Sequence, residues 1–165
     1  MDAAWWGFIG TVIGALASIG TTYLSNKSAI DLQNETSKNE RRERHRSFQR
    51  ETMLQLQDAL HDAIRLIAKV HTEDKQAFSE TGKWGKNLLG DELSEGLRLA
   101  NRKVMLLVER IADDSVRADV KNTMEMATNV TFCESQEQSE ALLDRVFNES
   151  VVSIEKIGAA LRSLY

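Results

Sequence analysis

"FIGTVIGALASIGTTYLS", residues Phe8 to Ser25, decides the fold expected for this chain of 165 residues. The stretch belongs to a longer run in which no residue between Asp2 and Lys27 is ionisable. At about 1.5 Å per residue, a helix of that length exceeds the roughly 30 Å of hydrocarbon in a bilayer. The run therefore predicts a single transmembrane helix over residues 1–26.

The residues that flank this run are those that membranes place at their surfaces. Aromatic side chains lie near both ends, where amphipathic rings settle among the headgroups. Basic residues follow the run, and the positive-inside rule then puts the C-terminal side in the cytoplasm and the N-terminus outside. The residues expected at the membrane interface are Trp5, Trp6, Tyr23, Arg41, Arg42, Arg44 and Arg46.

A cleaved secretory signal is the alternative interpretation of the same run. Residues 15–17 (Ala-Leu-Ala) before Ser18 resemble a signal-peptidase site. A signal peptide begins with positive charge, however, and Asp2 is the only charged residue there, so a retained helix is favoured. Cys133 is the only cysteine, which allows no internal disulfide and suits a reducing compartment.

The rest of the chain predicts an all-α architecture. The chain has no proline, and apolar residues recur at intervals of three and four. Two expected buried stripes are Met53, Leu56, Leu60, Ile64, Ile67 and Val70, followed by Leu93, Leu97, Ala100, Val104, Leu107 and Ile111. Two more are Val116, Val120, Met124, Ala127 and Val130, then Leu142, Val146, Val151, Ile154, Ile157, Leu161 and Leu164, with Ser135 as the N-cap of the last helix.

These segments predict a cytosolic bundle of about four helices over residues 51–165. Residues 27–50 are polar and contain no glycine or proline, so they are expected to continue the membrane helix as a stalk, with a flexible linker as the alternative. This segment has seven basic and four acidic residues, whereas 51–165 has fourteen basic and twenty acidic ones. The basic stalk suits anionic membrane lipids, and the acidic bundle argues against binding of duplex nucleic acid.

The membrane helix has two unlike faces. At about 100° per residue, bulky apolar residues gather on one face and small or hydroxylated ones on the other. The small face consists of Gly7, Gly10, Thr11, Gly14, Ala17, Ser18, Thr21 and Ser25. Lipid requires no such division, so a partner helix is implied. Gly10 and Gly14 form a GxxxG pair that predicts either a tightly packed dimer or a ring of copies whose hydroxyls line a narrow, water-filled pore.

No catalytic residue, metal site or cofactor is expected. His45, His61 and His71 lack metal-ligand spacing and are interpreted as solvated or interfacial. Cys133 has no basic neighbour to activate it and is interpreted as a small buried residue near a helix end. The chain is therefore expected not to be an enzyme.

The loop "TGKWGKNLLG", residues Thr81 to Gly90, is the one candidate for a soluble ligand. Lys83 and Lys86 could pair with phosphates while Trp84 stacks on a base, which would make a small anionic site for a nucleotide or oligonucleotide. The alternative is an interhelical turn in which Trp84 folds onto the end of the bundle.

The layout of the chain resembles that of the single-pass membrane effectors of bacterial antiviral systems, and the Hailong-type effector is similar in layout. The features that carry this resemblance are Trp5-Trp6, the Gly10-Gly14 span, the basic "RRERHR" of residues 41–46 and a helical cytosolic domain. This resemblance implies a homo-oligomeric channel of the bacterial inner membrane that depolarises an infected cell, with a nucleotide-oligomer signal controlling its opening. The alternative function is a membrane-tethered scaffold or sensor whose bundle binds another protein.

Overall fold

The computed structural model describes residues 3–85 and 87–165, with side chains from residue 6 onward. Four helices make up the fold: α1 (Ala3–Thr81), α2 (Asp91–Val108), α3 (Asp114–Val130) and α4 (Gln136–Ser163). No strand occurs within the described ranges, which confirms the expected all-α class. The chain divides into two compact units, Met1–His45 and Arg46–Tyr165, so the predicted stalk 27–50 falls partly in each.

Helix α1 is uninterrupted from the apolar run into the first helix of the bundle, as the absence of glycine and proline predicted. It ends at Thr81 because Gly82 takes a φ of 68°, a left-handed conformation in which the glycine N–H donates to the carbonyl of Phe78 at 2.8 Å. By length and composition, α1 is the one helix in the described part of the chain that could cross a membrane.

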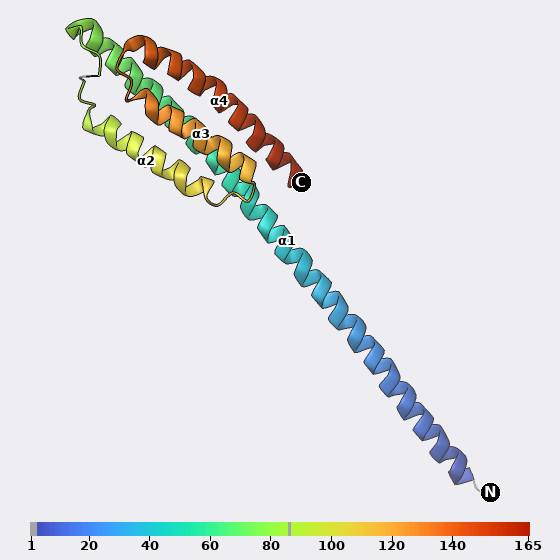
Figure 1. Ribbon diagram of the computed structural model, residues 1–165. Coiled ribbons are helices and arrows are strands. Elements are labelled where there is room, and N and C mark those ends of the chain that lie inside the picture. The colour runs from blue at the N-terminus through green and yellow to red at the C-terminus, as the bar shows by residue number, and fades with distance from the viewer. Residues whose placement is uncertain (1–2, 86) are drawn as a thin grey trace. The chain divides into compact units, whose positions relative to one another are not determined.

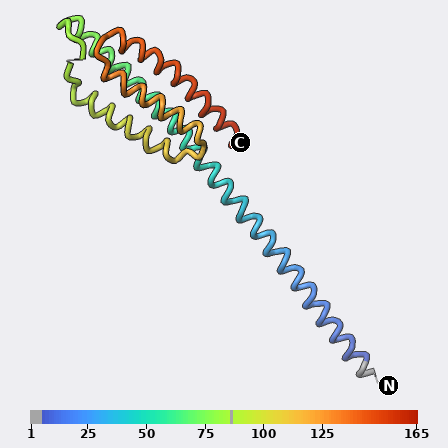
Figure 2. Tube along the Cα trace, viewed as in Figure 1, coloured from blue at the N-terminus to red at the C-terminus, as the bar shows by residue number. Residues whose placement is uncertain are grey.

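The second unit is an antiparallel four-helix bundle, in which α2, α3 and α4 lie alongside the C-terminal part of α1 (Figures 1 and 2). Its core contains every residue predicted for the stripe at 53–70 and every one predicted for the stripe at 116–130. The helix starts follow the expected capping chemistry. Asp113 accepts hydrogen bonds from the N–H groups of Ser115 and Val116, and Ser135 accepts one from that of Gln138.

The stripe predicted for α4 is wrong at one position, because Val151 is 56% exposed. The buried face of α4 instead steps from Val146 to Ser150 and Ser153 before it reaches Ile157. Ser153 is tolerated in the core because its hydroxyl lies 3.0 Å from that of Thr123 on α3, which satisfies both buried groups. The prediction was based on apolar residues alone, so it left Ser150 and Ser153 out of the buried stripe.

One substitution made at two sites of α4 tests this register. Val146→Ala removes two buried methyl groups and should lower the free energy of unfolding by about 2 kcal/mol, since a cavity is left in the core. The matched control Val151→Ala should change it by less than about 0.5 kcal/mol. Urea denaturation of the detergent-solubilised chain, followed by circular dichroism, measures both. Equal losses would contradict the register.

Candidate functional site

Among the described residues, no side chain packs against the small face of α1. All described side chains from Trp6 to His45 are exposed. A Cβ atom built at Gly7, Gly10 or Gly14 meets nothing within 4 Å. Packing inside this chain therefore gives no reason for glycine at these positions, although each glycine weakens the helix. A reason must come from molecules outside the chain.

The threonine hydroxyls of this segment bond to their own helix. The Oγ1 atoms of Thr11 and Thr21 donate to the carbonyls of Gly7 and Ala17, at 2.6 and 2.7 Å. Thr22 makes the same bond to the carbonyl of Ser18 at 2.8 Å. Each hydroxyl proton is satisfied without water, as hydrocarbon demands, while the oxygen can still accept a hydrogen bond from water or from another helix.

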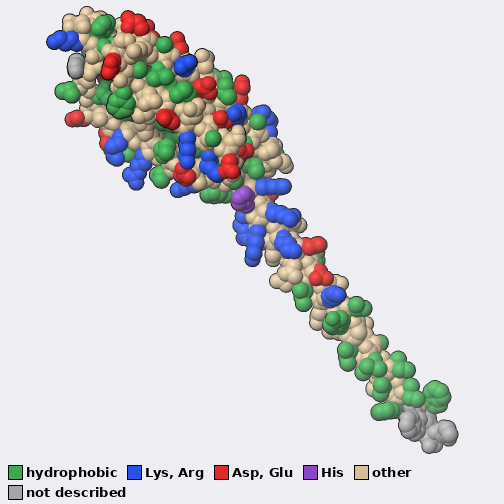
Figure 3. Space-filling model, viewed as in Figure 1, with side chains coloured by type: hydrophobic (Ala, Val, Ile, Leu, Met, Phe, Trp, Pro, Cys, Tyr) green, Lys and Arg blue, Asp and Glu red, His purple; other side chains and the backbone are tan. Residues whose placement is uncertain are grey.

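The basic cluster after the apolar run lies far along the helix. Figure 3 shows hydrophobic side chains along the N-terminal segment, with Lys and Arg side chains gathered further on. Arg41 follows Lys27 by fourteen residues in continuous helix, which corresponds to about 21 Å. In a helix normal to the bilayer, that distance exceeds both the depth of the headgroup layer and the Debye length of about 8 Å. With Lys27 at the surface of a bilayer, such a helix would place Arg41 about 21 Å beyond it, and the interface positions expected for the basic cluster stay a prediction.

Two of the predicted site residues cannot be placed in full. The side chain of Trp5 and the whole of Lys86 lie outside the described residues. Trp6 and Tyr23 are exposed, as membrane-facing aromatic residues would be in an isolated chain.

Trp84 packs onto the end of the bundle. Its indole N–H donates to the carbonyl of Cys133 at 3.1 Å, and its ring lies 5.8 Å from that of Phe78 and 5.6 Å from that of His71, centroid to centroid. These contacts are those of an interhelical turn, and they occupy the ring that base stacking would need. Lys83 is exposed beside a hollow of about 280 Å³ that also touches Thr81 and Asn87. Binding of an anion there stays a prediction.

His71 is buried, so its interpretation as a solvated or interfacial residue is wrong. Its Nδ1 atom lies 2.8 Å from the hydroxyl of Ser139, which is buried on α4. The helical periodicity could have predicted this burial, because position 71 continues the stripe of Ile64 and Ile67 at the expected spacing. His71 and Ser139 are both buried, and the contact between them links α1 to α4.

Cys133 is half-buried just beyond the end of α3, more exposed than the sequence suggested. Its Sγ atom donates to the carbonyl of Asn129 at 3.5 Å. Partial burial raises the pKa of the thiol, which favours its protonated form.

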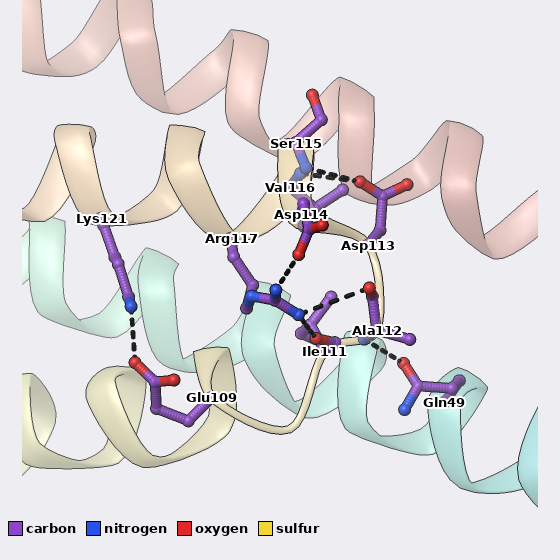
Figure 4. Close-up of polar contacts among 10 residues, drawn as sticks. All are labelled: Gln49, Glu109, Ile111, Ala112, Asp113, Asp114, Ser115, Val116, Arg117 and Lys121. Carbon is purple, nitrogen blue, oxygen red and sulfur yellow. Dashed lines mark hydrogen bonds and ion pairs between the residues drawn. The ribbon is translucent and has the colours of Figure 1, made fainter.

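A polar cluster holds the turn between α2 and α3 against α1 (Figure 4). The side-chain amide of Gln49, on α1, donates to the carbonyl of Arg110 and accepts from the N–H of Ala112, both at 2.9 Å. Arg117 adds a bond to the carbonyl of Ile111 at 2.5 Å and an ion pair with Asp114. The turn thereby gains partners for backbone groups that no helix satisfies.

The charges near this turn pair with each other. Lys121 lies 2.6 Å from Glu109, and the hydrogen bond and charge of the lysine hold the pKa of Glu109 below its usual value. Among the described residues, no group of three or more His, Cys, Asp or Glu could hold a metal ion. The hydrogen bonds of Gln49 and Arg117 to backbone groups give the cluster a part in holding the turn.

Comparison with protein-family models, with curated protein sequences and with solved structures finds no match to this chain. Its function must therefore be inferred from its own residues and geometry. Packing within the chain accounts for the bundle, its turns and Trp84, whereas the small face of α1 is left without an explanation.

Gln49 gives a test of the turn cluster. Gln49→Ala should lower the free energy of unfolding of the bundle by about 2 kcal/mol, because two hydrogen bonds to backbone groups are lost at a site only 4% exposed. Gln55→Ala is the matched control, since the amide of Gln55 is exposed and bonds only to Glu51. Urea unfolding curves measure the free energy of unfolding of both variants, and Gln49→Ala should be the less stable. Equal free energies of unfolding would contradict the role of Gln49 in holding the turn.

Proposed function

We propose that this protein is a homo-oligomeric, single-pass membrane channel in which copies of α1 surround a narrow path. One observation carries the proposal. The glycines of the small face have open space around them, although each glycine lowers the stability of the helix. Small residues at this spacing let helix backbones approach closely, so the simplest neighbour is a second α1.

The hydroxyls of the small face suit the lining of a pore. Dry helix contacts in a bilayer also use serine and threonine, whose hydroxyls bond across helices. The small face presents Thr11, Ser18, Thr21 and Ser25, whose oxygens can also accept hydrogen bonds from water. One span cannot enclose a pore alone, so several copies are required. Such a lining carries no charge and would discriminate weakly between ions.

The arrangement in the cell follows from the charge pattern and from layout. The basic residues after the span support an N-terminus outside and a bundle in the cytoplasm, across the inner membrane of a bacterium. The layout shared with single-pass antiviral effectors supports a role in depolarising the membrane, with a nucleotide or oligonucleotide as the candidate signal. A membrane-tethered scaffold that binds another protein through its bundle is the competing function.

The chain contains a matched pair of glycines for a test. Gly14→Leu places a bulky side chain on the small face and should abolish conductance, because the helices can no longer approach. Gly20→Leu makes the same change on the opposite face, also in open space, and should leave conductance within about twofold of the wild type. Single-channel recording in planar bilayers, with insertion verified for each variant, gives the measurement.

Discrete current steps in the wild type and in Gly20→Leu, but not in Gly14→Leu, are the expected result. Absence of current from inserted wild-type protein would favour the tethered scaffold. Equal loss in both glycine variants would show that the division into faces has no role in conduction.

A further inference from the structure

The charges in the first part of the stalk, residues 27–39, are confined to one side of the helix. Between residues 27 and 39 the charged residues are Lys27, Asp31, Glu35 and Lys38. At about 100° per residue they fall within an arc of about 80°. A helix surrounded by water commonly carries charges all round. Here about three quarters of the circumference is uncharged, although every side chain in this range is exposed within the chain.

The uncharged side of the stalk is continuous with the small face. Leu32 follows Gly14 by about five turns and Thr36 follows Ser18 by about five turns, so each pair lies on one line along the helix. Leu32 is 66% exposed and lies about 7 Å beyond Lys27 along the axis, where bulk water rather than lipid would meet it. Leu32 thus offers an exposed apolar side chain on the same line as the small face.

The stalk also needs a neighbour for its stability. Residues 27–45 are helical, yet none of their side chains is buried against the rest of the chain. Short polar helices in water are marginal without packing, because nucleation is costly and each residue adds little. A helix held at both ends still gains most of its stability from a packed face.

We infer that the contact between copies extends beyond the membrane, with a second copy of this chain packed in parallel along the uncharged side of the stalk as far as Thr36. This inference rests on the proposed function. All copies insert with the same orientation, so identical residues lie at the same height and Leu32 of one copy meets Leu32 of the next. The uncharged side can then pack with no charge to desolvate, while Lys27, Asp31, Glu35 and Lys38 stay in water.

Single-cysteine cross-linking of the full chain in phospholipid vesicles tests this contact. Cys133→Ser removes the native thiol and keeps a donor for the carbonyl of Asn129. Leu32→Cys and Thr36→Cys report on the uncharged side. Asp31→Cys and Asn34→Cys, on the other side, are matched controls, and Ser18→Cys reports on the membrane segment. Copper phenanthroline with oxygen oxidises two apposed thiols to a disulfide, which joins two chains on a gel.

We expect dimer yields at positions 18, 32 and 36 to exceed those at 31 and 34 by at least fivefold. Cross-linking at 18 with equal or absent yields at the four stalk positions would overturn the stalk contact and leave the channel intact. Cross-linking at 32 and 36 without conductance would support the stalk contact and overturn the channel. Absence of cross-linking at 18, 32 and 36 would overturn both.

Discussion

The fold depends on the uninterrupted backbone hydrogen bonding of α1. No glycine or proline lies between Gly20 and Gly82, so nothing in the sequence breaks the helix over that range. An α-helix satisfies its own amides and carbonyls, which is what a bilayer requires of a single span, and the same element later supplies one wall of the bundle. Because the helical period runs through the first unit without a break, the small face of α1 and the uncharged side of residues 27–39 keep one rotational phase.

The sequence predicted most of the fold because its apolar residues mark the helical period clearly. The stripes at 53–70 and 116–130 are buried in full, and Asp113 and Ser135 cap the helices that they precede. The errors arose where polar side chains occupy the core. Ser150, Ser153 and His71 are buried, but polarity placed them outside the predicted stripes. Ser153 and His71 bond to Thr123 and Ser139 on other helices, contacts that form only after the helices meet, so residue type alone could not show them. Ser150 instead donates to the carbonyl of Phe147 in its own helix.

The candidate site was less accessible to sequence reasoning. The two faces of α1 follow from the helical period alone, but the partner proposed for the small face is a second copy of the chain, which one chain does not contain. Trp84 shows the opposite case. The glycines and lysines around Trp84 suggested a ligand loop, yet its indole packs near Phe78 and His71 on α1 and donates to the carbonyl of Cys133, 49 residues away in the sequence. The distance along the axis from Lys27 to Arg41 likewise depends on the helix being continuous between them, which the structure shows.

The central claim is that water reaches the small face inside an assembly of copies. Cysteine accessibility during current recording tests it most directly, with Ser18→Cys and Leu16→Cys compared in a Cys133→Ser background. A charged, thiol-specific methanethiosulfonate reagent should block the current through Ser18→Cys, since position 18 faces the path, and should leave Leu16→Cys unaffected, since position 16 faces lipid. Unchanged current in Ser18→Cys, or block in Leu16→Cys instead, would contradict the account.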